Sequence, residues 1–137
     1  MNSENLQRAI YTKLTSDAAL MALVTGVYAE VEQPEDAAQV SDFPYVSIGQ
    51  DTATPFDAKT FFGSDATVQI DVWSRSNNMI EAKQIGSAVT NALHHQPLSI
   101  QGASHVMTVQ QSEAYTRDPD GHTKRGLLLF QVVFTRN

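Results

Sequence analysis

The residue pair with the clearest potential for chemistry is Asp71 beside Trp73, in a stretch where polar and apolar side chains alternate. A carboxylate held against an indole can serve as a buried general base. However, Asp71 has no second carboxylate at a spacing that would complete such a site. We therefore expect Asp71 to lie on the outer face of a sheet, paired with a cross-strand Arg or Lys.

Four histidines are the next candidates. His94 and His95 are adjacent near the end of an expected helix, and neighbouring helical side chains point roughly 100° apart, so they cannot jointly face one metal. We expect them to interact with the partial negative charge of the helix C-terminus. His105 and His122 fall in an expected strand and turn, without a carboxylate at a fixed spacing, and we expect both to be solvated.

Acidic side chains also cluster at Glu30, Glu32, Glu35 and Asp36. Carboxylates can coordinate calcium, but the spacing and glycine of an EF-hand loop are missing, so we interpret the cluster as a solvated acidic rim. The sequence has no phosphate-binding loop, nucleophile elbow or zinc-binding helix motif. These patterns disfavour an enzyme and predict no catalytic residue, no cofactor and no bound metal.

The composition limits the class of protein further. A chain of 137 residues with 42% apolar residues can form a single domain over residues 1–137 with one core. Its lack of cysteine excludes disulfides and thiolate metal sites. Without a bilayer-length apolar stretch or a signal-peptide pattern, we expect a soluble protein with no membrane partner. The net charge of −6 argues against a surface that grips duplex DNA.

The elements that would position these side chains are clearest between residues 66 and 93. Apolar residues occupy every second position from Ala66 to Val72, which predicts a strand with one buried face. Asn78 can cap a following helix, with Glu81 reaching back in a capping box. The apolar positions of that helix recur at helical spacing: Ala82, Ile85, Gly86, Val89 and Leu93.

The N-terminal region predicts two helices before the first strand. Ser3 can cap a helix that buries one stripe, formed by Leu6, Ile10 and Leu14. A short second helix starts at Ser16 or Asp17, and Gly26 is placed to end it in the left-handed conformation. We then expect a strand over residues 27–31, an exposed acidic loop over 32–42 and a strand over 45–50.

Residues 51–65 form the most unusual segment. Pro55 and Gly63 predict bends, so we expect a long loop, yet it contains three phenylalanines: Phe56, Phe61 and Phe62. Long loops in compact domains are uncommon unless functional, and clustered exposed aromatics indicate a contact surface. The alternative is that the phenylalanines fold back onto their own core.

The C-terminal region predicts an antiparallel hairpin. Residues 118–121, Asp-Pro-Asp-Gly, have the composition of a tight turn between strands over 104–114 and 123–135. Leu127 and Leu129 make the second face of the last strand more apolar than a water-facing surface needs, so we expect a neighbouring subunit or a helix of the same chain to cover it. The whole order predicts an α+β fold: a mainly antiparallel sheet with helices on one face and a C-terminal β-hairpin.

Taken in chain order, these elements resemble the tail-completion or tail-terminator proteins of long-tailed phages, also found in prophages and gene-transfer particles. The opening helices and first strand are similar at Leu6, Ile10, Leu14, Asp17, Leu20, Leu23, Val24, Gly26, Val27 and Tyr28. The next strand is similar at Phe43-Pro44-Tyr45-Val46, and the central strand at Gln69-Ile70-Asp71-Val72-Trp73-Ser74. The later helix and closing strand are similar at Glu81, Ala82, Ile85, Val89, Ala92, Leu93, Arg125, Phe130 and Val132.

The resemblance implies a structural virion protein that forms a ring, commonly a hexamer, at the head-proximal end of the tail. The ring would end tube polymerisation and give the head a docking face. The implied partners are further copies, the major tail tube protein and the head–tail connector protein, with DNA passing through without specific binding. The implied location is the virion tail or neck, after assembly in the bacterial host cytoplasm.

We assign the subunit or partner contacts from the residues themselves, to Phe56, Phe61, Phe62, Leu127 and Leu129. Two alternatives remain at this point. One is a head-side neck connector or adaptor. The other is a small domain that binds a ligand between helix and sheet.

Overall fold

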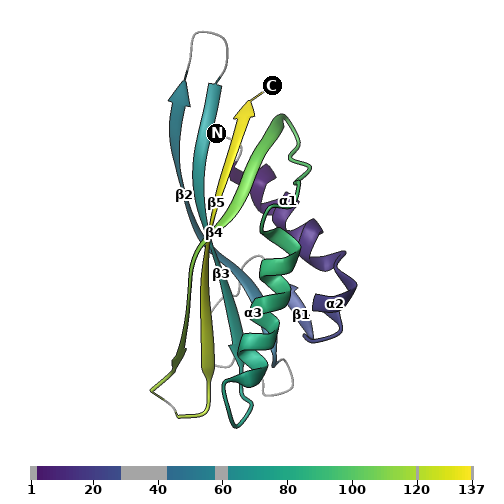
Figure 1. Ribbon diagram of the computed structural model, residues 1–137, viewed down its shortest axis with the longest axis vertical. Coiled ribbons are helices and arrows are strands. Elements are labelled where there is room, and N and C mark those ends of the chain that lie inside the picture. The colour runs from purple at the N-terminus through teal and green to yellow at the C-terminus, as the bar shows by residue number, and fades with distance from the viewer. Residues whose placement is uncertain (1–2, 29–42, 58–61, 120, 137) are drawn as a thin grey trace.

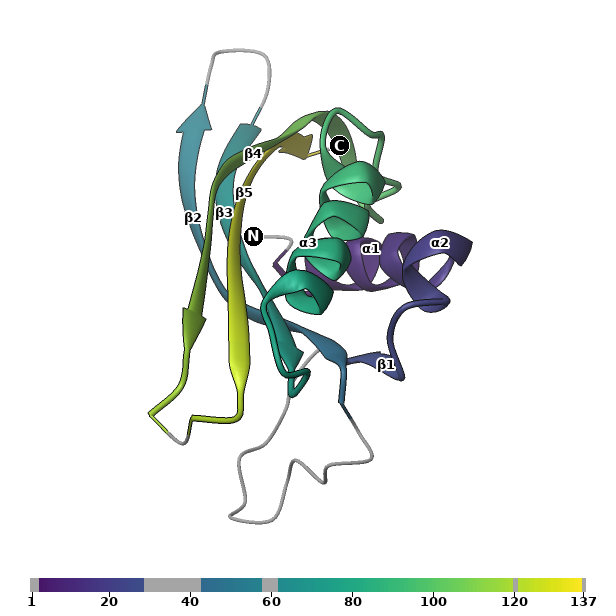
Figure 2. The same cartoon turned by 60° about the horizontal axis from the view of Figure 1, so that its bottom comes forward.

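The computed structural model describes residues 3–28, 43–57, 62–119 and 121–136. These residues form one sheet with helices on one of its faces (Figures 1 and 2). The elements in chain order are α1 (Ser3–Thr15), α2 (Ala18–Met21), β1 (Gly26–Tyr28), β2 (Tyr45–Asp57), β3 (Phe62–Ser74), α3 (Ile80–Leu93), β4 (Ala103–Arg117) and β5 (Lys124–Arg136).

The strands lie in the order β1-β2-β3-β5-β4. β1 runs parallel to β2, and all other neighbours are antiparallel. The α+β fold with a mainly antiparallel sheet is therefore confirmed, and so is the C-terminal hairpin of β4 and β5. The turn of this hairpin uses Gly121 at φ 76°, with the Gly121 N–H donating to the Asp118 carbonyl at 3.0 Å.

The core lies between the helices and the sheet. Every second residue of β5 from Leu128 to Phe134 is buried against the helices, as is the expected stripe of α1. Burying one large aliphatic or aromatic side chain contributes about 1.5–3 kcal/mol to the stability of the fold. This layer of buried side chains therefore stabilises a chain that has no disulfides. Among the described residues, no helix is long and apolar enough to cross a membrane.

Two predicted helix boundaries need correction. Asp17 does cap α2, because its carboxylate accepts the Leu20 N–H at 3.0 Å, but Gly26 begins β1 and does not end a helix. At α3, Asn78 accepts the Ile80 N–H at 2.9 Å, yet Glu81 does not reach back. Glu81 instead accepts a hydrogen bond from the Ser74 hydroxyl at 2.7 Å, so the capping box is wrong. The helix is thereby tied to the end of β3.

The expected long loop over residues 51–65 is also wrong. β2 continues to Asp57 and β3 begins at Phe62, so most of this segment is a hairpin with one register shift between Ile48 and Asp51. The reason is that β3 pairs with β5 along its whole length, which supports a strand despite its bend-forming residues. The expected acidic loop over 32–42, the calcium-like carboxylates within 30–36 and the end of the strand over 27–31 lie outside the described residues.

Candidate assembly surface

The described helices all lie on one face of the sheet, and none of them covers the other face (Figure 2). We call this other face the open face. Along β5 and β4 it carries a set of apolar side chains, which we call the apolar strip: Leu127, Leu129 and Val133 of β5 with Met107, Val109 and Ala114 of β4. The β5 members are half-buried, and Met107 and Ala114 are exposed. Apolar side chains gathered on an exposed sheet face indicate a contact with another molecule.

Polar side chains of β3 and β5 pair with one another on the same open face. Asp71 is only 5% exposed, and its Oδ1 accepts bonds from Arg125 Nη2 at 3.0 Å and Nε at 3.2 Å. Gln131 similarly donates to both carboxylate oxygens of Asp65 at 2.9 Å. The expected cross-strand pairing of Asp71 with an arginine is confirmed. A carboxylate held in this way links neighbouring strands.

An aromatic group lies at the β1 end of the same face, and the sequence analysis missed it. Tyr45 and Trp73 are cross-strand partners and stack with ring centroids 6.3 Å apart. Tyr28 contacts Tyr45 edge-on at 5.6 Å, and Arg125 lies 5.1 Å from the Trp73 ring. These residues come from four strands. Only the strand register, which sequence spacing does not give, brings them together.

Phe56 and Phe62 lie at the opposite end of the sheet and are 40% and 56% exposed. They do not fold back onto the core. Phe56 covers Gly63, its cross-strand partner, and the Arg136 guanidinium lies 5.0 Å from the Phe62 ring. Phe61 lies outside the described residues. The predicted contact residues thus form two separate groups, since Leu127 is level with Asp71 on β3 and far from this end.

The structure places the histidines in the predicted elements but changes some of their surroundings. His94 is the C-cap of α3, and its Nδ1 accepts the Gln110 backbone N–H at 3.0 Å. His105 is half-buried, with Nε2 2.6 Å from the Thr108 hydroxyl, and burial lowers its pKa. Across the described part of the chain, no three His, Asp or Glu side chains are grouped to hold a metal ion.

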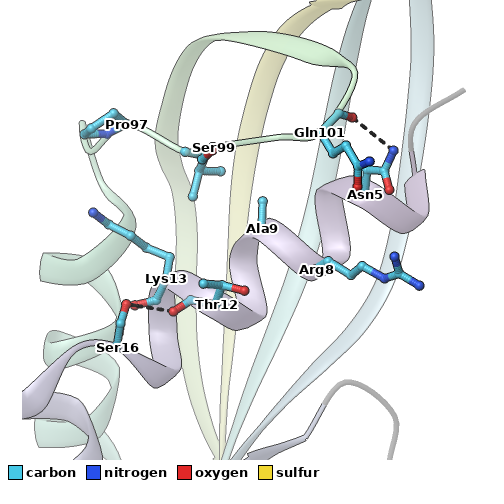
Figure 3. Close-up of a pocket in the computed structure, with 10 residues that line it drawn as sticks. Asn5, Arg8, Ala9, Thr12, Lys13, Ser16, Pro97, Ser99 and Gln101 are labelled. Atoms are coloured by element: carbon cyan, nitrogen blue, oxygen red, sulfur yellow. Dashed lines mark hydrogen bonds between the residues drawn. The ribbon is translucent and has the colours of Figure 1, made fainter.

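A groove of about 400 Å³ lies between α1 and the connection that precedes β4 (Figure 3). Its side chains do not converge on one point. At one end Asn5 donates to the Gln101 carbonyl at 3.0 Å, and at the other the Ser16 hydroxyl bonds to the Thr12 carbonyl of its own helix at 2.7 Å. Arg8 points away from the groove and pairs with Glu4. The groove therefore lacks the convergent polar groups of a ligand site.

Residues 8–135 match the family described as tail completion protein gp17. The tail completion protein gp17 of Bacillus phage SPP1 is 34% identical over 135 residues, which cover 98% of this chain and 94% of the relative. The chain belongs to the gp17 tail completion family. It is thus a structural virion protein of the phage tail type.

Two solved structures extend this assignment. A chain in the virion of a native gene transfer agent particle superposes on this tail completion protein with a TM-score of 0.82 at 28% identity, covering 95% of this chain and 94% of that one. The solved structure of SPP1 gp17 gives 0.58 at 33% identity, covering 98% and 91%. The fold described here is therefore closer to that of the particle subunit, although its sequence is closer to SPP1 gp17.

Proposed function

We propose that this tail completion protein forms a hexameric ring at the head-proximal end of the tail, where it stops tube growth and gives the head connector a docking face. The observation that carries the proposal is the apolar strip on the open face. Fully covering one leucine contributes about 1.5–3 kcal/mol, and Leu127 and Leu129 are only half-buried in the single chain. A neighbouring subunit in a ring supplies the missing cover.

Two strand edges support a head-to-tail contact between copies. β4 pairs with β5 on one side, and β1 flanks β2 only over Tyr45–Ser47. No other strand of the described residues flanks β4 or the 52–55 part of β2. Because β2, β3, β5 and β4 are successively antiparallel, β2 and β4 run in opposite directions. A neighbour that presents its β2 to β4 would pair antiparallel, and repetition of this one contact can close a ring.

The two edges are also placed diagonally across the sheet. Ala114 of β4 is level with Ser47 of β2, through Leu127 and Asp71. The 52–55 part of β2 lies further towards the end that carries Phe56. Pairing it with the part of β4 around Ala114 would shift each subunit along its strands. Strands in closed barrels are tilted and staggered in this way, so the offset is compatible with a ring.

The exposed end of the sheet that carries the phenylalanines suggests a second contact, and the net charge of the chain suggests how a ring would interact with DNA. Phe56 and Phe62, together with Phe61, are the aromatic anchors we propose for the neighbouring subunit or the tail tube protein. With a net charge of −6, a ring would not attract phosphates strongly, so DNA would pass through without specific binding. Assembly would take place in the bacterial host cytoplasm.

The tail position is favoured over the neck adaptor because the matched family is a tail completion family. A ligand-binding domain is disfavoured because the groove in Figure 3 lacks convergent polar groups, and two of its polar side chains, Asn5 and Ser16, bond to the chain's own backbone.

Tube capping tests this proposal. Purified protein is added to polymerising tail tube protein, and tube length is followed by light scattering and negative-stain imaging. Wild-type protein should give short tubes that end in rings, whereas Leu127→Glu/Leu129→Glu should remain a folded monomer and leave tube growth unrestricted. Ile80→Glu is the matched control, because Ile80 is an exposed aliphatic residue on the helix side. Capping by the double variant at wild-type levels would overturn the role of the apolar strip.

A further inference from the structure

Two adjacent histidines occupy the middle of the β4 edge. The Gln110 N–H donates to His94 Nδ1 at 3.0 Å, and the His95 N–H donates to the Thr108 carbonyl at 2.8 Å. Thr108 and Gln110 are two residues apart on one strand, so these backbone groups point to the same side, away from β5. Covering an edge with a loop is one way in which proteins prevent unwanted strand pairing.

The fold holds these histidines at the edge. His94 ends α3, with its N–H donating to the Thr90 carbonyl at 2.8 Å, and His95 turns the chain at φ 58°. The two imidazole centroids are 4.0 Å apart. On the strand side, register shifts between His105 and Met107 and between Gln110 and Ser112 bracket the bonded segment. The two irregularities of β4 therefore flank the short segment that makes the two hydrogen bonds.

One of these bonds depends on the charge of an imidazole. A protonated imidazole donates at both nitrogens, so His94 can accept the Gln110 N–H only in its neutral form. Two other imidazoles lie near it. The His95 ring centroid is 4.0 Å away, and His105 Nε2 lies 2.6 Å from the hydroxyl of Thr108 on the capped segment of β4.

We infer that His94 and His95 form a pH-sensitive cap on the edge of β4, closed while the His94 imidazole is neutral and opened by its protonation. While closed, the cap occupies the backbone groups that a second copy's strand would need at Thr108 and Gln110. It thus directs strand pairing towards residues 111–117 of β4. This consequence for assembly rests on the proposed ring, whereas the cap itself does not.

Amide hydrogen exchange of Gln110 tests the cap in the chain alone, without tail tube protein. Its protection is measured by NMR from pH 8 to pH 5, the range in which imidazoles titrate, relative to the core amide of Phe130. Protection in the wild type should fall about fivefold as the pH drops, the value of one ordinary hydrogen bond. His94→Asn keeps an acceptor near the Nδ1 position but does not titrate, so its protection should stay constant.

Two further variants extend the hydrogen-exchange experiment. His94→Ala removes the acceptor and should show low Gln110 protection at every pH, together with increased self-association at pH 8 in light scattering. His122→Asn, in the β4–β5 turn, should behave as the wild type. Constant protection in the wild type, or an equal fall in His94→Asn, would overturn the proposal. If His94→Ala fails to fold, the comparison of the wild type with His94→Asn still decides it. Because no ring is needed, failure of the cap is separable from failure of the proposed function.

Discussion

The two faces of β5 differ in how completely their side chains are buried. Leu128, Phe130 and Val132 are fully buried beneath the helices, while Leu127 and Leu129, which alternate with them, are only half-buried on the open face. The side chains are of similar type on both faces. What differs is the cover, because every helix among the described residues packs on one face.

The apolar character of a strand therefore does not by itself identify the core. The apolar side chains on the helix side are covered by helices of the same chain, so substitutions there should lower the stability of the fold. The apolar side chains on the open face are only partly covered, and in our account substitutions there impair assembly.

Phe130→Ala should reduce the free energy of unfolding by about 3–5 kcal/mol, because it opens a cavity beneath the helices. Leu129→Ala, one residue away on the open face, should cost under about 1 kcal/mol, because water already reaches this side chain. Urea denaturation of the two variants as monomers measures both values. Equal losses would show that the faces are not energetically distinct.

Gly86→Ala should destabilise the protein by about 1–3 kcal/mol, although alanine is the better helix former. A Cβ at this buried position of α3 would collide with the Tyr115 hydroxyl, which docks β4 against the helix. Ser87→Ala on the exposed side of the same helix is the control and should be neutral or slightly stabilising. A stabilising Gly86→Ala variant would mean that Tyr115 moves away at no cost.

Arg125→Ala should cost about 1 kcal/mol, because it leaves the buried Asp71 carboxylate without its guanidinium partner. The estimate is modest, since the Arg125 side chain is 35% exposed and solvent screens the pair. A double-mutant cycle with Asp71→Asn measures the coupling between the two residues. A coupling of zero would assign the destabilisation to the lost contact with Trp73.

The smallest predicted effect is a loss of stability that occurs only in alkaline solution. Burial, together with the hydrogen bond to Glu113 and its negative charge, raises the pKa of Tyr115 to about 12. An unfolded tyrosine releases its proton near pH 10, so the contribution of Tyr115 to stability should be present below pH 10 and lost as the pH rises towards 12. Absorbance at the phenolate band should show a component titrating near pH 12 that Tyr115→Phe lacks. Its persistence in that variant would contradict the assignment.

Much of the fold could be predicted because it follows from local patterns. The alternation from Ala66 to Val72 predicts the buried side of β3, and the turn residues around Gly121 predict the last hairpin. The hairpin over residues 51–65 could not be predicted in the same way. Pro55 and Gly63 locally indicate bends, but long-range pairing with β5 keeps β3 extended.

The candidate surface was predictable in composition but not in arrangement. The excess apolar character at Leu127 and Leu129 is visible in the sequence, whereas the partners from β4 depend on two register shifts. For the same reason the contact between His94 and Gln110 was missed. It joins residues of two elements through a backbone N–H, and no residue type indicates such a donor.

Disulfide cross-linking tests the proposed subunit contact through the open face and its strand edges. The chain contains no cysteine, so Ala114→Cys on β4 can be combined with Thr54→Cys on β2 without other thiols. The strand order β2-β3-β5-β4 separates these strands by three spacings, roughly 14 Å, which is too far for a disulfide within one chain. Oxidation in the presence of tail tube protein should give a ladder of covalent oligomers ending in a closed ring, and each single variant should give at most a dimer. A double variant that caps tubes normally but remains monomeric after oxidation would contradict the account.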